Sequence, residues 1–390
     1  NEVVLTQGVG IWVPGNPRSA VRKDIVEANI LKLRGGDAYP LSKLDWQPVS
    51  ADAKGEFSGP VFDGGYAWLR YDSPDDRVVF LEASGSSVSY ANWAPRAGDP
   101  YSFNYVSLPV KLRRGRNDFM FAVGRGRLAA KLVDAPAGVT IDLRDTTSPY
   151  IGEGKNYSMS AVGIVLRNSA EVPMKATVTD QVAGASQVVA SLTLPPLSTR
   201  KVPAYLPSVA GKHQLSVNGG APETLELQPI KAGSAYKVTF KSNVDDSVQY
   251  YGVEESTKSD PDQSLFLSLH GASVEALGQA QAYGPHDFGN LIAATNRRPF
   301  GFDWEEVGRL DALEVLEQGK ARFKPDPLRV YLTGHSMGGH GSWSIGSLFP
   351  DKFAAVMPSA GWISFTTYAG GATYREQDPV QAILKRANNA

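Results

Sequence analysis

The segment Gly334-His335-Ser336-Met337-Gly338-Gly339 constrains the fold of this chain more than any other part of its sequence. It has the pattern Gly-x-Ser-x-Gly, and it stands between an apolar run at 329–333 and a helical stretch at 343–349. This order predicts a buried parallel strand, a sharp turn and a helix. So tight a turn strains its central residue and brings the helix close to the strand, so the flanking positions need glycine. Ser336 is therefore the candidate nucleophile, and the amide of Met337 at the helix N-terminus is a candidate oxyanion donor.

A second apolar strand is predicted over residues 265–269, and it runs directly into His270-Gly271-Ala272. A backbone amide approaches a substrate most closely where side chains are small. We therefore expect Ala272 or Gly271 to supply the second amide of an oxyanion hole. His270 is interpreted as a packing and hydrogen-bonding residue of this loop, not as a base.

Composition narrows the class of protein. A chain of 390 residues is longer than one that usually folds around a single hydrophobic core, which predicts two or three domains. The charge is nearly balanced, with 39 basic and 40 acidic residues, so we expect no positive electrostatic field that would favour binding of nucleic acid. No apolar run approaches the roughly 18 residues that would span a bilayer.

Cysteine and histidine usage narrows the chemistry further. With no cysteine and five separated histidines, neither a disulfide, a metal site nor another cofactor is expected. The chain begins at Asn1 without Met, a hint that a targeting segment or tag has been removed, and we expect a secreted or periplasmic bacterial protein.

The first two regions of the chain are β-rich. Residues 1–148 contain short strand-like runs at 3–5, 66–71, 77–81 and 118–123, separated by turn residues, which predict a β-sandwich. Within it, residues 108–117 resemble the Leu-x-x-Gly-x-Asn corner of galactose-binding-like jelly rolls, here interpreted as a spacer or lid more than a sugar site. Residues 149–232 alternate in the manner of an immunoglobulin-like sandwich and contain no ionisable cluster, so a scaffold is expected.

The pattern changes beyond residue 233. Runs at 236–240 and 247–253 predict a hairpin at a sheet edge. Strands at 265–269, 291–295, 330–333 and 353–357 then alternate with helical stretches that include 274–280 and 304–318. This alternation predicts a mostly parallel, doubly wound sheet, which binds ligands at the carboxyl ends of its strands.

Taken together, residues 233–390 resemble an α/β-hydrolase of the prolyl oligopeptidase and esterase superfamily. The resemblance rests on His270-Gly271-Ala272, Gly301-Phe302-Asp303-Trp304, Gly334 to Gly339 and Pro358-Ser359-Ala360-Gly361-Trp362, in that order. It implies a metal-independent acyl transfer to Ser336 from a small-molecule ester or a peptide, with a histidine as base and a carboxylate that orients it. The expected architecture is two N-terminal β-sandwiches followed by the first part of a doubly wound α/β-hydrolase domain.

The sequence departs from this family after the nucleophile, where the acid and then the histidine should follow. Only His340 follows Ser336, four positions along the same predicted helix, where it points away from the pocket. Asp351 is expected in a surface turn, and no histidine follows Glu376 or Asp378. We therefore expect the acid and histidine to come from a C-terminal complementing segment or a second chain, which would also cover an exposed apolar sheet edge.

Other polar residues have plainer interpretations. His286 is expected in a loop, with a role as the missing base as the alternative. Asp311 is expected to form a salt bridge or cap on its helix, and Asp303 is another acid that is not expected to serve the serine. Arg297 and Arg298 are expected in a solvated loop, the alternative being contact with an anionic substrate group.

Two other functions stay open at the level of sequence. The chain is alternatively a carbohydrate-binding or adhesion protein whose hydrolase part is catalytically incomplete. The same serine would also serve acyl transfer to an acceptor other than water.

Overall fold

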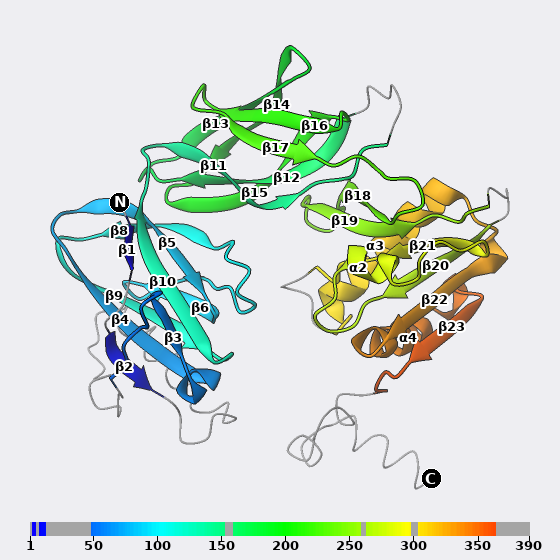
Figure 1. Ribbon diagram of the computed structural model, residues 1–390, viewed down its shortest axis with the longest axis horizontal. Helices are drawn as coiled ribbons and strands as arrows, with labels where there is room; N and C mark the ends of the chain where they lie inside the picture. Colours follow the sequence, from blue (N-terminus) through cyan, green and yellow to red (C-terminus); the bar gives the residue numbers. More distant parts are fainter. Residues whose placement is uncertain are drawn as a thin grey trace, which may run out of the picture. The chain divides into compact units, whose positions relative to one another are not determined.

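The structure is a computed structural model that describes residues 2–4, 8–12, 48–152, 159–258, 263–297 and 303–363 (Figure 1). The described part is mostly β-sheet, with few helices. The chain divides into two compact units. The first comprises residues 1–146, 164–202 and 214–223, and the second comprises residues 147–163, 203–213 and 224–390.

Two five-stranded sheets form most of the first unit. One has the order β1-β10-β5-β8 with β3 paired to β10, and the other has the order β2-β4-β9-β6-β7. Alternate residues of the two sheets meet in one core, which includes Leu81 and Leu132 from the first sheet and Phe119 and Phe121 from the second. The strands are β1 (Glu2–Val4), β2 (Gly8–Trp12), β3 (Glu56–Ser58), β4 (Gly65–Ser73), β5 (Arg77–Ser84), β6 (Ser86–Ala91), β7 (Ala94–Ala97), β8 (Ser107–Leu112), β9 (Gly115–Val123) and β10 (Arg127–Asp134), with a 3₁₀ turn, η2 (Pro60–Asp63), before β4.

A buried asparagine closes the corner between β8 and β9. Asn117 is fully buried, and its side-chain amide donates to the carbonyl oxygens of Arg113 and Gly115 at 2.8 and 2.9 Å. Its Oδ1 accepts from the Arg113 amide at 3.0 Å, and Gly115 has a φ of +85°, which favours glycine. The Gly-x-Asn part of the corner motif therefore has a local physical cause.

The middle of the chain forms two further sheets, in the orders β11-β12-β15 and β14-β13-β16-β17, and β13 is antiparallel to both β14 and β16. The division into two units passes through their strands, so the domain boundaries at 148 and 232 and the two sandwich types stay predictions. The strands are β11 (Val139–Thr147), β12 (Met159–Asn168), β13 (Met174–Val182), β14 (Ala185–Leu194), β15 (Ser198–Pro207), β16 (Gly211–Val217) and β17 (Glu223–Leu227).

A six-stranded sheet in the second unit carries the candidate site, with the order β18-β19-β21-β20-β22-β23 (Figure 1). The predicted hairpin is present as antiparallel β18 and β19, with β18 at the sheet edge, and the last four strands are parallel to one another. The elements are β18 (Tyr236–Lys241), β19 (Val248–Glu254), β20 (Ser264–Leu269), α2 (Ala276–Gln281), β21 (Gly289–Ala293), α3 (Glu306–Phe323), η3 (Pro327–Arg329), β22 (Val330–His335), α4 (Met337–Leu348), η4 (Pro350–Lys352) and β23 (Ala355–Ser359).

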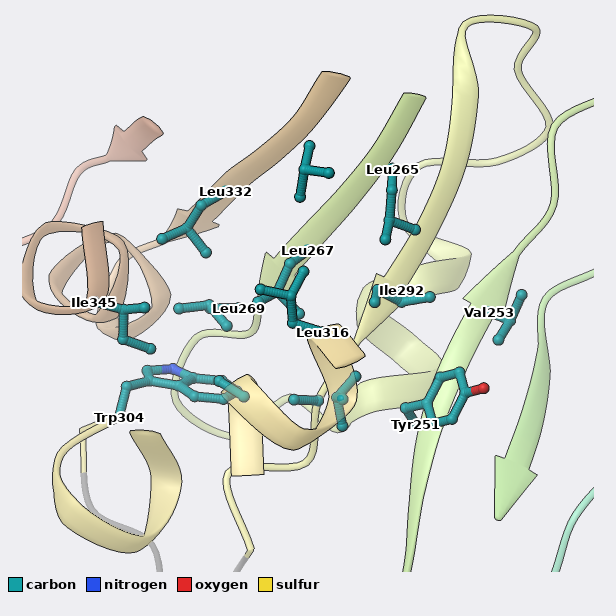
Figure 2. Packing of buried hydrophobic residues seen from close by; sticks show 14 of the residues in the cluster. Tyr251, Val253, Leu265, Leu267, Leu269, Ile292, Trp304, Leu316, Leu332 and Ile345 are labelled. Carbon is teal, nitrogen blue, oxygen red and sulfur yellow. The ribbon is translucent and has the colours of Figure 1, made fainter. Parts of the chain in front are cut away.

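Helices cover both faces of this sheet. Ile292 of β21 joins the core beneath α3 and α4, whereas its neighbours Leu291 and Ala293 pack with Ala276 and Ala280 of α2 on the other face. Figure 2 shows the α3 and α4 side of this core, where Trp304 lies beside Leu269 and Ile345. The arrangement agrees with the doubly wound pattern expected from the alternation of strands and helices.

Candidate active site

Ser336 stands at the sharp turn between β22 and α4. It has a φ of +58° and a ψ of −116°, a conformation that side-chain-bearing residues rarely adopt. Its amide donates to the carbonyl oxygen of Ser359 at 2.9 Å, and its carbonyl accepts from the His340 amide at 3.1 Å. The side chain is half-buried, and its hydroxyl makes no hydrogen bond to another described residue. The turn therefore holds a strained serine with an accessible oxygen.

The neighbouring glycines are required by close backbone contacts. A Cβ on Gly338 would lie 1.9 Å from the carbonyl oxygen of Leu269, and one on Gly334 would lie 2.3 Å from that of Gly338. On the other side, a Cβ on Gly339 would lie 2.3 Å from the carbonyl oxygen of Ser359. The start of α4 is thus wedged between the ends of β20 and β23, which leaves Ser336 no room to relax.

The loop after β20 lies beside the serine. Leu269 pairs with Gly334 in the parallel register, so Gly271 continues level with Ser336. A Cβ on Gly271 would lie 3.7 Å from the Cβ of Ser336. Ala272 is exposed, and its amide makes no hydrogen bond within the described part of the chain. Met337 is the first residue of α4, so its amide has no acceptor within the helix. Gly271 and Met337 therefore lie directly beside Ser336, and Ala272 follows Gly271 in the same loop.

His270 holds the backbone of this loop in place through both of its ring nitrogens. It is fully buried, its Nδ1 lies 2.9 Å from the carbonyl oxygen of Gly271, and its Nε2 lies 3.0 Å from that of Thr295. Its ring meets Trp304 edge to face at 4.9 Å, and the indole of Trp304 donates to the His270 carbonyl at 3.1 Å. The histidine orients the loop backbone and does not point to Ser336.

All five histidines of the sequence lie within the described residues, and none is hydrogen-bonded to the Ser336 hydroxyl. Each has a ring nitrogen close to another acceptor: His213 to the Val209 carbonyl, His270 to two carbonyls, His286 to the Gly284 carbonyl, His335 to the Ser359 hydroxyl and His340 to the Trp362 carbonyl. His286, the first alternative as a base, also packs its ring against Phe288, with centroids 4.2 Å apart and an interplanar angle of 35°. The histidines of this chain therefore serve structural contacts.

His340 anchors α4 to the segments that precede α3 and follow β23. Its Nδ1 lies 2.9 Å from the carbonyl oxygen of Trp362, and its Nε2 lies 3.0 Å from Glu305 Oε1. Its ring stacks on Trp362 with an interplanar angle of 10°. Glu305 directly precedes α3 and also accepts from Ser344 at 3.3 Å. The sequence does not reveal that Glu305 and Trp362 contact α4, because nothing in their local sequence marks them as partners of that helix.

The interpretation of Arg297 as a solvated loop residue is wrong. Arg297 is only 5% exposed, and its guanidinium lies 2.9 Å from Asp245 and 2.8 Å from Glu314. It also donates to the hydroxyl of Ser242. Because these carboxylates come from a hairpin turn and from α3, the arginine is a buried tie between them and does not meet an anionic substrate.

Asp311 belongs to the same buried cluster. Its Oδ2 accepts from the amide and the hydroxyl of Thr295 at 3.0 and 3.1 Å, which makes it a cap on the end of β21. Its Oδ1 lies 3.7 Å from the Nε of Arg297, without a hydrogen bond. Burial raises the pKa of Asp311 to about 6, although Arg297 and the Thr295 bonds oppose that shift. The expected salt bridge is therefore present, whereas Asp311 does not cap its own helix and instead binds the segment that follows β21.

The remaining sequence candidates lie away from the serine or outside the described residues. Asp351 is exposed on the 3₁₀ turn η4, and Asp303 is buried at a positive φ just before α3. Arg298, Glu376 and Asp378 lie outside the described residues. Among described side chains, no group of three or more His, Asp or Glu is placed to hold a metal ion. Nor is any described helix long and apolar enough to cross a membrane.

Comparison with known proteins finds weak structural similarity to esterases and other hydrolases. No protein-family model and no curated protein matches the sequence. An S-formylglutathione hydrolase from Staphylococcus aureus matches at 17% identity and a TM-score of 0.26, over 33% of this chain and 57% of that one. A fluorophosphonate-binding serine hydrolase from the same organism matches at 17% identity and a TM-score of 0.28, over 41% and 75%.

A ferulic acid esterase from the anaerobic fungus Anaeromyces mucronatus matches at 16% identity and a TM-score of 0.30, over 38% of this chain and 65% of that one. The chain thus spans just over half the length of the first of these proteins. Likeness at such TM-scores is too low to support a functional conclusion, which has to rest on the geometry around Ser336.

Proposed function

We propose that this chain carries the nucleophile and oxyanion hole of a serine hydrolase that cleaves an ester or peptide bond. The observation that carries the proposal is the strained Ser336, held at a φ of +58° between a central strand and a helix by backbone contacts on both sides. A conformation of this kind persists only where its surroundings enforce it, and such strain concentrates at functional sites. The Gly-x-Ser-x-Gly turn has this structural context in α/β-hydrolases.

In the proposed mechanism, the Ser336 oxygen attacks a substrate carbonyl and gives a tetrahedral intermediate. The amides of Met337 and of Ala272 or Gly271 stabilise its oxyanion, helped by the positive end of α4. Collapse expels the alcohol or amine and leaves an acyl group on Ser336, which water then removes. An acceptor other than water would turn the same chemistry into acyl transfer.

The base and the carboxylate that orients it are the components that the proposal does not assign to residues of this chain. Each of the five histidines contacts another group. We infer that a polypeptide outside these 390 residues supplies the histidine and its carboxylate. Strand β23 pairs only with β22 among the described strands, and Met357 on it is half exposed, as is Trp343 on α4. Exposed apolar side chains and an open strand edge suit the binding of such a polypeptide.

Chemical rescue tests the nucleophile without the missing histidine. The chain is incubated with a fluorophosphonate, with and without imidazole as a diffusible base, and labelled peptides are identified by mass spectrometry. We expect imidazole to accelerate labelling of Ser336, and the chain assembled with the polypeptide that supplies the histidine to react at Ser336 without imidazole.

Two variants control this experiment. Ser336→Ala should abolish the accelerated labelling. Ser347→Ala, which removes an exposed hydroxyl from the same helix, should leave it unchanged. Absence of a Ser336 adduct in the assembled protein would refute the proposed function. Turnover of aryl esters against peptide anilides by the assembled protein then separates esterase from peptidase activity.

A further inference from the structure

A strained turn after β21 contacts the loop that carries the candidate oxyanion residues (the oxyanion loop, residues 270–272). In this turn, Asn296 and Arg297 have φ values of +60° and +49°, a left-handed conformation that is costly for residues with side chains. Both residues are almost fully buried. Because two strained residues in succession persist only where neighbouring groups enforce them, the contacts of this turn indicate its role.

Asp311 of α3 holds the start of the turn. Its Oδ2 accepts from the backbone amide and the hydroxyl of Thr295 at 3.0 and 3.1 Å, and that hydroxyl in turn accepts from the Arg297 amide at 3.1 Å. Helix α3 lies close to the turn, where a Cβ on Gly308 would be 1.8 Å from Asn296 Oδ1. One buried carboxylate therefore fixes Thr295 through both its amide and its hydroxyl.

The carbonyl group of Thr295 connects the turn to the oxyanion loop. It lies 3.0 Å from Nε2 of His270, whose Nδ1 lies 2.9 Å from the carbonyl oxygen of Gly271. That carbonyl and the amide of Ala272 belong to one peptide unit. Because a peptide unit is planar, the position of the Gly271 oxygen sets the direction of the Ala272 N–H. The buried imidazole thus transmits the position of Thr295 to a candidate oxyanion donor.

We propose that Asp311 is a positioning residue: through Thr295 and His270, its carboxylate orients the backbone of the oxyanion loop. This inference rests on the proposed function of Ser336. Asp311 itself touches neither the serine nor the loop in any contact described for it, so its effect on the reaction passes entirely through the two residues between them. An oxyanion hole stabilises charge only when its donors are held in place before the reaction, which is what this chain of contacts supplies.

The role depends on the charge of Asp311. Burial raises the pKa of Asp311 to about 6, although Arg297 and the Thr295 bonds oppose that shift. Two further carboxylates, Asp245 and Glu314, are joined to the cluster through Arg297. Asp311 is therefore ionised at neutral pH and takes up a proton as the pH falls through about 6. Protonation weakens its bonds to Thr295, because hydrogen bonds to an ionised acceptor are roughly twice as strong as those to a neutral one.

Imidazole-assisted labelling of Ser336 by a fluorophosphonate measures this role, because the adduct places a phosphonyl oxygen in the oxyanion hole. At neutral pH we expect Asp311→Asn and Thr295→Val each to slow labelling about tenfold. Thr295→Ser keeps the hydroxyl and should restore the wild-type rate. Glu314→Gln is the matched control: it disrupts the contacts with Arg297 and Ser242 in the same buried cluster but leaves Thr295 untouched, so it should label as the wild type does.

A pH profile separates positioning from a purely structural role. All rates are measured well below the thermal midpoint of each variant, so that loss of global stability does not change them. The wild-type rate divided by the Asp311→Asn rate should rise between about pH 5 and 7 as the carboxylate ionises. The protonation of imidazole itself affects both proteins equally and cancels in this ratio. A pH-independent ratio, or equal slowing by Glu314→Gln and Asp311→Asn, would overturn the proposal.

A readout without chemistry distinguishes failure of this proposal from failure of the proposed function. In the chain labelled with ¹⁵N-histidine, the ring nitrogens of His270 are assigned by single histidine substitutions and followed by NMR against pH. We expect their resonances to respond to the ionisation of Asp311 in the wild type and in Glu314→Gln, but not in Asp311→Asn. If no protein forms a Ser336 adduct, the proposed function fails. If the His270 resonances of Asp311→Asn follow the wild-type profile, the positioning role fails.

Discussion

Replacing Gly338 by alanine should separate α4 from the end of β20. The new Cβ would lie 1.9 Å from the carbonyl oxygen of Leu269 and 3.1 Å from that of His270. Because carbon and oxygen need well over 3 Å, the helix start must retreat by more than about 1 Å. The obstacle is backbone and not a flexible side chain, so we expect about 1–3 kcal/mol of destabilisation from overpacking.

The matched control is Gly278→Ala in α2. A Cβ there meets only Val274 Cγ1, at an ordinary 3.8 Å, and should stabilise its helix by about 0.5–1 kcal/mol. The two substitutions are chemically identical and should act in opposite directions.

Hydrogen exchange measured by mass spectrometry reads each helix separately, which matters in a chain with more than one unit. A loss of about 2 kcal/mol corresponds to roughly 30-fold faster exchange in peptides covering residues 330–348. If Gly338→Ala protects that segment as well as the wild type does, close helix approach is not the reason for this glycine, and the account of the turn fails.

Two further substitutions test the groups around the site. His340→Ala removes contacts to Trp362 and Glu305 and should destabilise the packing of α4 by about 1–3 kcal/mol, seen as a lower thermal midpoint with Ser336 still present for labelling; an unchanged midpoint would show that the histidine does not anchor the helix. Asp311→Asn tests the raised pKa. Since the folded-state pKa of about 6 lies above the ordinary 3.8, the native state binds the extra proton, and the contribution of Asp311 to the free energy of unfolding falls as pH rises from about 4 to 6. Relative to the wild type, the variant should therefore gain on the order of 2–3 kcal/mol between pH 4 and 7 in urea titrations, and a pH-independent difference would contradict the shift.

Local features of this fold were predictable because their causes are local. The turn at Ser336 follows from glycines whose Cβ positions are occupied by neighbouring backbone, and the corner at Asn117 follows from a side chain that binds its own loop. Helix α3 begins at Glu306, two residues after the predicted start, because Asp303 and Trp304 adopt positive φ values that no periodicity reveals. Burial of Trp304 against Gly341 enforces that conformation, and it depends on a segment distant in sequence.

Arg297 shows where sequence reasoning had to fail. Its partners Ser242, Asp245 and Glu314 come from two separate elements, so only the folded arrangement converts a loop arginine into a buried tie. The candidates for a base are a different case, because the number of histidines in the sequence limits them before any fold is known. Five candidates exist; a carbonyl oxygen contacts a ring nitrogen in four of them, and the Ser359 hydroxyl contacts the fifth, the exposed His335.

The serine turn and the missing base support a single conclusion. The backbone conformation of Ser336 costs on the order of 1–3 kcal/mol, and neighbouring backbone on both sides enforces it. A structural turn at this position would not need that strain, because a glycine would adopt the same φ without it. A reactive hydroxyl would account for a serine at this position, and its reaction at neutral pH would need a base. The proposed histidine from outside these residues rests on that proposed function and on the contacts of the five histidines, and imidazole rescue of Ser336 labelling tests it directly.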